Sequence, residues 1–250
     1  MRFGKVFKAL GPVITLAVAG GLAACDNANI RINDSEGVPL SELDLSGDPP
    51  REVVLVGPDN LDIRTGETLA IEIEGSDEIK QRLRFVRDGS TLAIMRAKGE
   101  SSRDTATVIV TMPSPSKLTV GGSGTITAAE LTGDAEAHVL GSGSLIVAGI
   151  AADTLSVTIA GSGSMRGGGK TGALELDVLG SGNAELGRLS AGKADVTIAG
   201  SGSATFASDG EIDAEILGSG SVTVRGEARC RVRTVGSGAL VCERNTEPVD

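Results

Sequence analysis

Residues 137–144 of the chain are AHVLGSGS, and residues 157–164 are VTIAGSGS. The Gly-Ser-Gly triplet in both stretches occurs seven times in the second half of the chain, at successive intervals of 19, 20, 19, 20, 18 and 18 residues. So regular an interval is typical of a solenoid, in which each repeat forms one coil that stacks on the coil before it. The seven serines are Ser123, Ser142, Ser162, Ser181, Ser201, Ser219 and Ser237.

Apolar and polar residues alternate around each triplet. Leu155, Val157 and Ile159 stand seven, five and three residues before Ser162, and a further apolar column, here Met165, follows three residues after the serine. A period of two indicates strands with one buried face, and about 19 residues suffice for one coil of two or three short strands. The sequence therefore predicts an all-β fold, a parallel β-helix with about 19 residues per coil. Its repeat core covers residues 116–242, and a double repeat of about 39 residues per coil is the second choice.

The triplet itself predicts a tight corner, because glycine tolerates positive φ and close approach of another backbone. Stacked corner serines would then form a ladder of hydroxyl groups. The column two residues before the serine alternates large and small side chains, which we interpret as interior packing between neighbouring coils. Its members are Leu140, Ala160, Leu179, Ala199 and Leu217.

The first half of the chain lacks the triplet. Residues 26–51 are polar and rich in Gly and Pro, which predicts a flexible spacer. Short β-type runs begin at Val53, and Ile79 to Leu83 is the one candidate for a helical turn. An uncovered β-helix end would polymerise, so we expect this half to cap one end. Glu243, Arg244 and Pro248 indicate a cap at the other end, before a tail at residues 246–250.

Residues 53–241 resemble the bacterial head GIN domain, also called the putative auto-transporter adhesin head domain. The resemblance rests on Val56-Gly57-Pro58 before Asp62-Ile63, on the DGSTLAI stretch at 88–94, on a strand that ends near Pro113, and on the triplet series. It implies a right-handed, pectin-lyase-like β-helix, here over residues 52–245. It also implies no known catalytic residues and a role in adhesion at the cell envelope.

The N-terminal 25 residues have the form of a secretory signal. Arg2, Lys5 and Lys8 precede an apolar stretch that ends in Leu22-Ala23-Ala24-Cys25. This ending is similar to the bacterial lipobox, which implies lipidation of Cys25 and stable anchoring by its acyl chains. An ordinary signal peptide cleaved near Ala24 is the alternative. Asp26 follows, and in enteric bacteria an aspartate there is associated with the inner membrane, so we expect an inner-membrane lipoprotein that faces the periplasm, with the outer membrane as the alternative.

Composition excludes several classes of function. The net charge is −10, so no basic surplus is available to neutralise the phosphates of a nucleic acid. The chain has one histidine, which rules out a histidine cluster for a metal and leaves His138 as the sole imidazole for catalysis. His138 falls in an outward column with Ser156 and Thr158 on the next coil, an arrangement too common on β-helices to indicate an enzyme. We expect no catalytic residue and no organic cofactor.

Carboxylates gather in two outward columns, six and four residues before the serines. Stacked at about 4.8 Å, such like charges repel unless a cation or a partner compensates. One hypothesis is a Ca²⁺ site, since oxygen ligands suit that ion; the alternative is a solvated acidic face. Arg231 and Arg233 end the two columns, and we expect them to lie over Asp213 and Glu215. The candidate Ca²⁺ ligands are Glu175, Asp177, Asp195, Asp213 and Glu215.

Cys230 and Cys242 both fall in inward columns near the C-terminus. An exported protein meets an oxidising compartment, so a disulfide that staples the last coil is one expectation. Two buried thiols are the alternative, because positions that face each other across a core can be too far apart to bridge.

The sequence leaves three classes of function open. The first is a lipid-anchored envelope protein that displays a rigid, acidic β-helix to a protein or matrix partner. The second is a polysaccharide-active enzyme, for which Arg166, Lys170 and Asp177 would be the candidates. The third is a structural or signalling subunit of a membrane complex. We favour the first.

Overall fold

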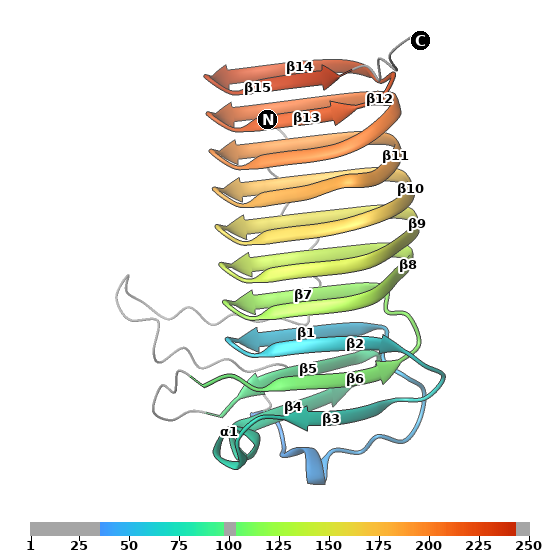
Figure 1. Ribbon diagram of the computed structural model, residues 1–250, viewed down its shortest axis with the longest axis vertical. Helices are drawn as coiled ribbons and strands as arrows, with labels where there is room; N and C mark the ends of the chain where they lie inside the picture. The colour runs from blue at the N-terminus through green and yellow to red at the C-terminus, as the bar shows by residue number, and fades with distance from the viewer. Residues whose placement is uncertain (1–35, 98–103, 244–250) are drawn as a thin grey trace, which may run out of the picture.

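The computed structural model describes residues 36–97 and 104–243, which form one continuous sheet wound into a β-solenoid of about seven turns (Figure 1). The coils stack along the long axis, and strand pairing between them is parallel. The predicted fold class is confirmed. After a short 3₁₀ helix at Leu40–Glu42, the elements are β1 (Glu52–Gly57), β2 (Asn60–Thr65), β3 (Ala70–Glu74), α1 (Asp77–Arg82), β4 (Leu83–Asp88), β5 (Thr91–Arg96), β6 (Thr107–Met112), β7 (Lys117–Gly122), β8 (Thr125–Gly141), β9 (Ser144–Gly161), β10 (Ser164–Gly180), β11 (Asn183–Gly200), β12 (Ser203–Gly218), β13 (Ser221–Arg225), β14 (Arg229–Gly236) and β15 (Ala239–Glu243).

Each Gly-Ser-Gly triplet forms a corner at the left edge of Figure 1. We call the strand segment that leads into a corner limb A, the segment that leaves it limb B, and the opposite turn of the coil the far bend. The Ser181 backbone N–H donates to the Gly161 carbonyl at 2.9 Å, and the same bond recurs from corner to corner. The corner serines therefore form a single file, one per coil, and the double-repeat alternative is wrong.

Both glycines of a corner are sterically required. Gly180 has a φ of +120°, and a Cβ built on it would lie 2.5 Å from the Gly161 carbonyl oxygen. At the second position, a Cβ on Gly163 would lie 2.5 Å from Val139 Cγ1, inside the core. A side chain at the first position therefore collides with the previous coil, and one at the second with the coil interior.

The coil interior is built from the predicted columns. Leu155, Val157 and Ile159 of limb A are at most 1% exposed, and Met165 of limb B is fully buried. Repetition of these columns produces one core cluster along the solenoid. Burial of each such side chain contributes roughly 1.5–3 kcal/mol before the entropy of ordering is subtracted.

Three details differ from the sequence predictions. The large–small column, with Leu140, Leu179 and Leu217, faces outward and is half-exposed, because it is adjacent to an inward column in a strand of period two. Each of β8 to β12 is one bent strand of 16–18 residues rather than two or three short ones, with register shifts near the far bend. The hydroxyl contacts lie two residues beyond the corner serines, as between Ser144 Oγ and Ser164 Oγ at 3.3 Å.

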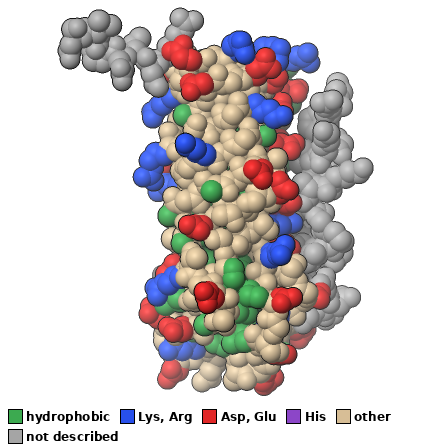
Figure 2. All heavy atoms as spheres, turned by 90° about the vertical axis from the view of Figure 1, so that its right-hand side faces the viewer, with side chains coloured by type: hydrophobic (Ala, Val, Ile, Leu, Met, Phe, Trp, Pro, Cys, Tyr) green, Lys and Arg blue, Asp and Glu red, His purple; other side chains and the backbone are tan. Residues whose placement is uncertain are grey.

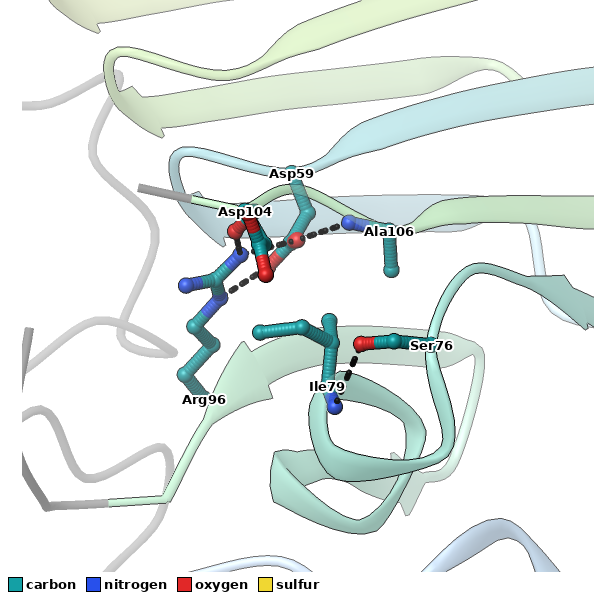
Figure 3. Close-up of polar contacts among 6 residues, drawn as sticks. All are labelled: Asp59, Ser76, Ile79, Arg96, Asp104 and Ala106. Carbon is teal, nitrogen blue, oxygen red and sulfur yellow. Dashed lines mark hydrogen bonds and ion pairs between the residues drawn. The ribbon is translucent and has the colours of Figure 1, made fainter. Parts of the chain in front are cut away.

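The first half of the chain adds further coils and closes one end. β1 and β2 form a coil whose corner is Gly57-Pro58-Asp59, and it pairs with β7 and β8 on one side and with β5 and β6 on the other. β3 and β4 pair antiparallel with β6 and β5 and lie at the end with α1 (Figure 1). The Ser76 hydroxyl accepts from the Ile79 N–H at the start of α1, which directs the 1%-exposed Ile79 into the core (Figure 3).

Part of the predicted spacer belongs to the fold. Leu40 and Leu43 pack against the core, and Val38 forms an antiparallel bridge with Phe85. The sequence assigned all of residues 26–51 to a flexible segment, which is wrong from residue 36 onward. Leu40 and Leu43 stand among polar residues, so the composition of the segment did not predict that they pack against the core.

The C-terminal coil consists of β14 and β15, with a disulfide between Cys230 and Cys242 and a Cα–Cα distance of 6.8 Å. Of the two alternatives that the sequence left open, the structure contains the bridge. Glu243 ends β15, whereas Arg244 and Pro248 of the predicted cap lie outside the described residues.

Reduction of this disulfide is expected to loosen the last coil selectively. A short closed loop restricts the unfolded chain and stabilises by about 2–4 kcal/mol. Amide hydrogen exchange should therefore accelerate in β14 and β15 after reduction, while β8 to β11 keep their protection. Protein unfolded without reductant should show no free thiol from these two cysteines; two free thiols would contradict the bridge.

Candidate binding surfaces

The outward face of limb A carries an acidic column whose two ends are cationic. Register pairing aligns Glu175, Asp195 and Asp213 on successive coils, with no cation between them. At the C-terminal end Arg231 Nε lies 2.8 Å from Asp213 Oδ1, as expected, and Arg233 is in register with Glu215. At the other end Lys117 Nζ lies 3.2 Å from Glu136 and 3.5 Å from Glu52. Lys117 was not predicted as a partner of this column, although it stands six residues before Ser123.

The five candidate Ca²⁺ ligands do not converge on one point. Glu175, Asp195 and Asp213 occupy one column, while Asp177 and Glu215 occupy the next and are separated by Thr197. Within residues 36–97 and 104–243, no three His, Cys, Asp or Glu side chains are grouped so that they could hold a metal ion. The carboxylates form a ladder along the solenoid rather than a coordination shell.

Asp177 lies in the column beside the ladder, and its pKa is shifted by its surroundings. Burial raises its pKa above 3.8, the charge of Glu175 raises it further, and a hydrogen bond with Thr197 opposes both. Asp213, at the exposed end of the ladder, has a lowered pKa because Arg231 hydrogen-bonds to it. The column of Glu175, Asp195 and Asp213 itself carries no cation between its members, and Lys193 stands two residues before Asp195 on the same face.

His138 is not exposed, although it lies outside the core cluster in the predicted outward column. The residue is 4% exposed, and its Nε2 lies 3.2 Å from Glu136 Oε2. Burial lowers the pKa of His138; the hydrogen bond with Glu136 opposes this shift, and the charge of Lys117 adds to it. Burial opposes ionisation of Glu136, but hydrogen bonds with His138 and Lys117 hold the pKa of that carboxyl below 4.5. The imidazole is thus a neutral structural partner of a carboxylate.

Acidification is expected to destabilise the protein through His138. Because its folded pKa lies below the ordinary 6.5, the unfolded chain binds the proton more readily, so stability present above pH 6.5 is lost as the pH falls. As the pH falls below 6.5, the free energy of unfolding should fall less steeply in His138→Gln than in the wild type.

Other carboxylates with shifted pKa values are present in both proteins of that comparison. Those with lowered pKa values contribute below their ordinary values, and they are Asp44, Glu136, Glu185 and Asp213. Asp177, with a raised pKa, contributes with the opposite sign. Urea unfolding at closely spaced pH values measures the two slopes. Equal slopes would show that His138 titrates as in the unfolded chain.

The candidates for polysaccharide chemistry are not gathered either. Arg166 Nε lies 2.7 Å from Glu185 Oε2 on the next coil, which raises the pKa of the Arg166 guanidinium and occupies it. Asp177 is in register with Thr158 and Thr197, and Lys170 is exposed. No arrangement of a nucleophile, a base and an orienting group involves these residues.

The far-bend side presents charges of both signs. Figure 2 shows basic and acidic side chains interspersed there, with hydrophobic side chains gathered toward the end that carries α1. A shallow hollow of ≈ 380 Å³ lies on this side between Glu130 and Arg188. This mixture contrasts with the row of carboxylates on limb A, which has cations paired at its two ends.

A larger groove of ≈ 1650 Å³ lies near the capped end, between residues 43–51, β4 and the far bend of β8. Arg87 extends into its wall and donates to the carbonyls of Asp44 at 3.2 Å and Asp48 at 2.5 Å. A hydrogen bond from Ser46 lowers the pKa of Asp44. The guanidinium therefore holds the wall in place, and sequence analysis missed the groove because it treated this wall as a spacer.

Cys25, the predicted lipidation site, lies outside the described residues. Among the residues that the structure does describe, no helix is long and apolar enough to cross a membrane.

Comparison with known proteins agrees with this architecture. Residues 49–228 match the family model described as putative auto-transporter adhesin, head GIN domain. No curated protein matches the sequence.

Solved structures share the fold at low sequence identity. A putative adhesin from Bacteroides fragilis NCTC 9343 is 21% identical with a TM-score of 0.72, and the match covers 78% of this chain and 93% of that one. A putative adhesin from Parabacteroides distasonis ATCC 8503 is 19% identical with a TM-score of 0.62, covering 79% and 93%. A third structure, titled a putative lipid binding protein from the same strain, is 21% identical with a TM-score of 0.61, covering 78% and 93%.

Proposed function

Because the chain belongs to the head GIN domain family of putative auto-transporter adhesins, we propose that it is a non-catalytic protein of the bacterial cell envelope that binds a protein or matrix partner. The observation that carries this proposal is the ladder of Glu175, Asp195 and Asp213 on limb A. It repeats at the spacing of the coils and lacks a cation within it. A rigid row of charges is suited to an extended partner with basic groups, since complementary charges steer association and fix register.

The proposed attachment is a lipid on Cys25. Leu22-Ala23-Ala24 before Cys25 supports cleavage and acylation there, and residues 26–35 then separate the lipid from the first described residue, Glu36. In cells fed labelled palmitate, the wild type should carry label and Cys25→Ser should not. Label in both variants would place the lipid elsewhere, and no label in the wild type would favour the ordinary signal peptide.

Asp26 supports retention in the inner membrane, with the domain in the periplasm. Density-gradient separation of the membranes should recover the protein with the inner membrane and move Asp26→Ser toward the outer one. Recovery of the wild type in the outer-membrane fraction would overturn this part of the proposal.

Neutralisation of the ladder tests the binding function. The chain from residue 26 onward, with Cys25 removed, is tested on immobilised matrix proteins, mucin and peptidoglycan. Binding should fall at least tenfold, equivalent to about 1.4 kcal/mol, in Glu175→Gln/Asp195→Asn/Asp213→Asn. The control Glu67→Gln/Glu78→Gln/Asp153→Asn removes the same number of exposed carboxylates elsewhere and should bind as the wild type does.

Two results would contradict this function. If wild type binds none of these surfaces, or if both triple variants bind alike, the ladder is not the contact surface. Unsaturated products released from polygalacturonate by the purified protein would favour the enzyme alternative. A stable stoichiometric membrane-protein partner that resists charge neutralisation would favour the structural or signalling subunit.

A further inference from the structure

The C-terminal coil has an open sheet edge. β14 pairs with β12 and β15 pairs with β13, and no other strand of the described part of the chain pairs with either (Figure 1). Such an edge leaves backbone N–H and C=O groups ready to accept another strand. The opposite end differs, because its last apolar side chains are covered, with Ile79 1% and Phe85 0% exposed.

Apolar side chains accompany this open edge. Five large hydrophobic residues are exposed in the described residues, and three of them lie on the last coil. Val232 points toward the coil interior and is nevertheless 46% exposed, because no further coil covers it; Val241 is 47% and Val235 69% exposed. A partner must therefore supply both strand edges and apolar cover.

The last coil of a second copy of the chain can supply both the strand edges and the apolar cover when the two copies are related by a twofold rotation. The disulfide sets Cys230 opposite Cys242 across the coil. Rotation about a twofold axis parallel to the strands lays β14 of one copy antiparallel on β15 of the other, with the far bends on the same side. Cys230 then lies over Cys242 of the second copy, Arg229 over its Glu243 and Val232 over its Leu240. Each contact occurs twice, as in any isologous interface.

A second twofold arrangement is possible, and the charges of the facing residues favour the first one. If the axis runs across the strands, β14 lies on β14 and the row of Arg229, Arg231 and Arg233 faces its own copy, which is repulsive. In the first arrangement Arg229 meets a carboxylate. Glu243 pairs with Arg225 at 3.7 Å and its side chain is 54% exposed, so in the dimer it is shared between Arg225 and Arg229 of the second copy.

We propose that the protein forms an end-to-end twofold dimer through its last coil, with β14 of each copy paired antiparallel to β15 of the other. Closure by a twofold axis uses both edges at once, so the assembly stops at two copies instead of growing into a fibre. This inference is independent of the lipid anchor and of the acidic ladder.

Charge reversal tests the register. Sedimentation velocity of the chain from residue 26 to 250, from about 1 to about 100 µM, should show a dimer for the wild type. Arg229→Glu and Glu243→Arg should each be monomeric, because each places like charges at both contacts. An equimolar mixture of the two single variants should dimerise, because the mixed pair restores opposite charges at both contacts. Arg166→Glu and Glu185→Arg reverse an exposed pair in mid-solenoid and should leave the dimer intact.

Several outcomes would overturn the proposal. A monomeric wild type across this range would do so, as would dimers in either single variant or a mixture that stays monomeric. Thermal melts of the single variants near that of the wild type exclude unfolding as the cause of a monomer. A wild type that dimerises only after deletion of residues 244–250 would show that the chain's own tail, not a second copy, occupies the edge.

Discussion

Gly180→Ala is expected to destabilise the solenoid by about 2–6 kcal/mol. Its φ of +120° is reserved almost entirely for glycine, and the added Cβ would meet the Gly161 carbonyl oxygen at 2.5 Å. That carbonyl accepts the hydrogen bond from Ser181 N–H, so the coils must separate at the corner to relieve the clash. Strain of about 1–3 kcal/mol at a forbidden φ and a similar cost of overpacking both contribute.

A glycine in the far bend is the matched control for this substitution. A Cβ on Gly149 would have its nearest neighbour at 3.5 Å, an ordinary contact, and its φ is not in the left-handed region. Gly149→Ala should be neutral or slightly stabilising, because alanine restricts the unfolded chain. The free energies of unfolding in urea decide the matter. Equal stability of the two variants would mean that the corner geometry is wrong.

Asp59→Ala is expected to cost about 3–5 kcal/mol, because it leaves a buried cation without its partner. Arg96 approaches both carboxylate oxygens of Asp59, at 2.6 and 2.7 Å, and the Ala106 N–H donates to the same carboxylate at 2.8 Å (Figure 3). Asp59 is 1% exposed and the Arg96 side chain 11%. The ion pair therefore fastens the β1–β2 corner to the next coil, at the end of β5 and the start of β6.

Two further variants separate the ion pair from other effects of the substitution. Asp62→Ala, on the neighbouring strand, breaks a solvent-exposed pair with Arg64 and should cost no more than about 1 kcal/mol. Asp59→Ala/Arg96→Met removes both charges and should be more stable than Asp59→Ala alone. If the double variant is the less stable of the two, loss of packing rather than an uncompensated charge explains the effect.

The repeat region could be predicted closely because its signals are local and recur seven times. Leu155, Val157 and Ile159 alternate in the sequence and point inward in the structure, since the period of two fixes the face of every residue in a strand. The same rule corrects the interpretation of Leu140 and its column. That column is adjacent to an inward one, so it had to face outward despite its hydrophobicity.

The first half could not be predicted in the same way, because its structure depends on contacts between distant segments. The β1–β2 coil lies between strands that follow it in the chain, and no local pattern states that order. Asp59 occupies the position of a corner glycine and looks like an ordinary turn residue in the sequence. Its role becomes visible only when Arg96 and Ala106 are brought beside it. The packing of Leu40 and Leu43 was likewise not predicted, because both residues stand in a polar segment.

Among the candidate sites too, contacts that follow from the repeat could be predicted, and contacts that depend on side-chain direction could not. Register pairs such as Asp213 with Arg231 follow from the constant repeat length, so sequence could place them. Metal binding and catalysis require side chains to converge on one point. Convergence depends on the direction of each side chain, which the column of equivalent repeat positions does not specify. For that reason the five carboxylates looked like a Ca²⁺ site in the sequence and form a ladder in space. The burial of His138 was not predicted either, because its position in an outward column indicates an exposed side chain.

Distances between spin labels on the corner serines test the central claim most directly. Pairs of cysteines at Ser123 with Ser201, Ser219 or Ser237 span four, five and six coils, and the bridged Cys230 and Cys242 do not take up label. With one coil per triplet and about 4.8 Å per coil, pulsed electron resonance should give distances near 19, 24 and 29 Å, which rise in equal steps. Distances that alternate between short and long would place successive corners on opposite sides and contradict the single file of serines.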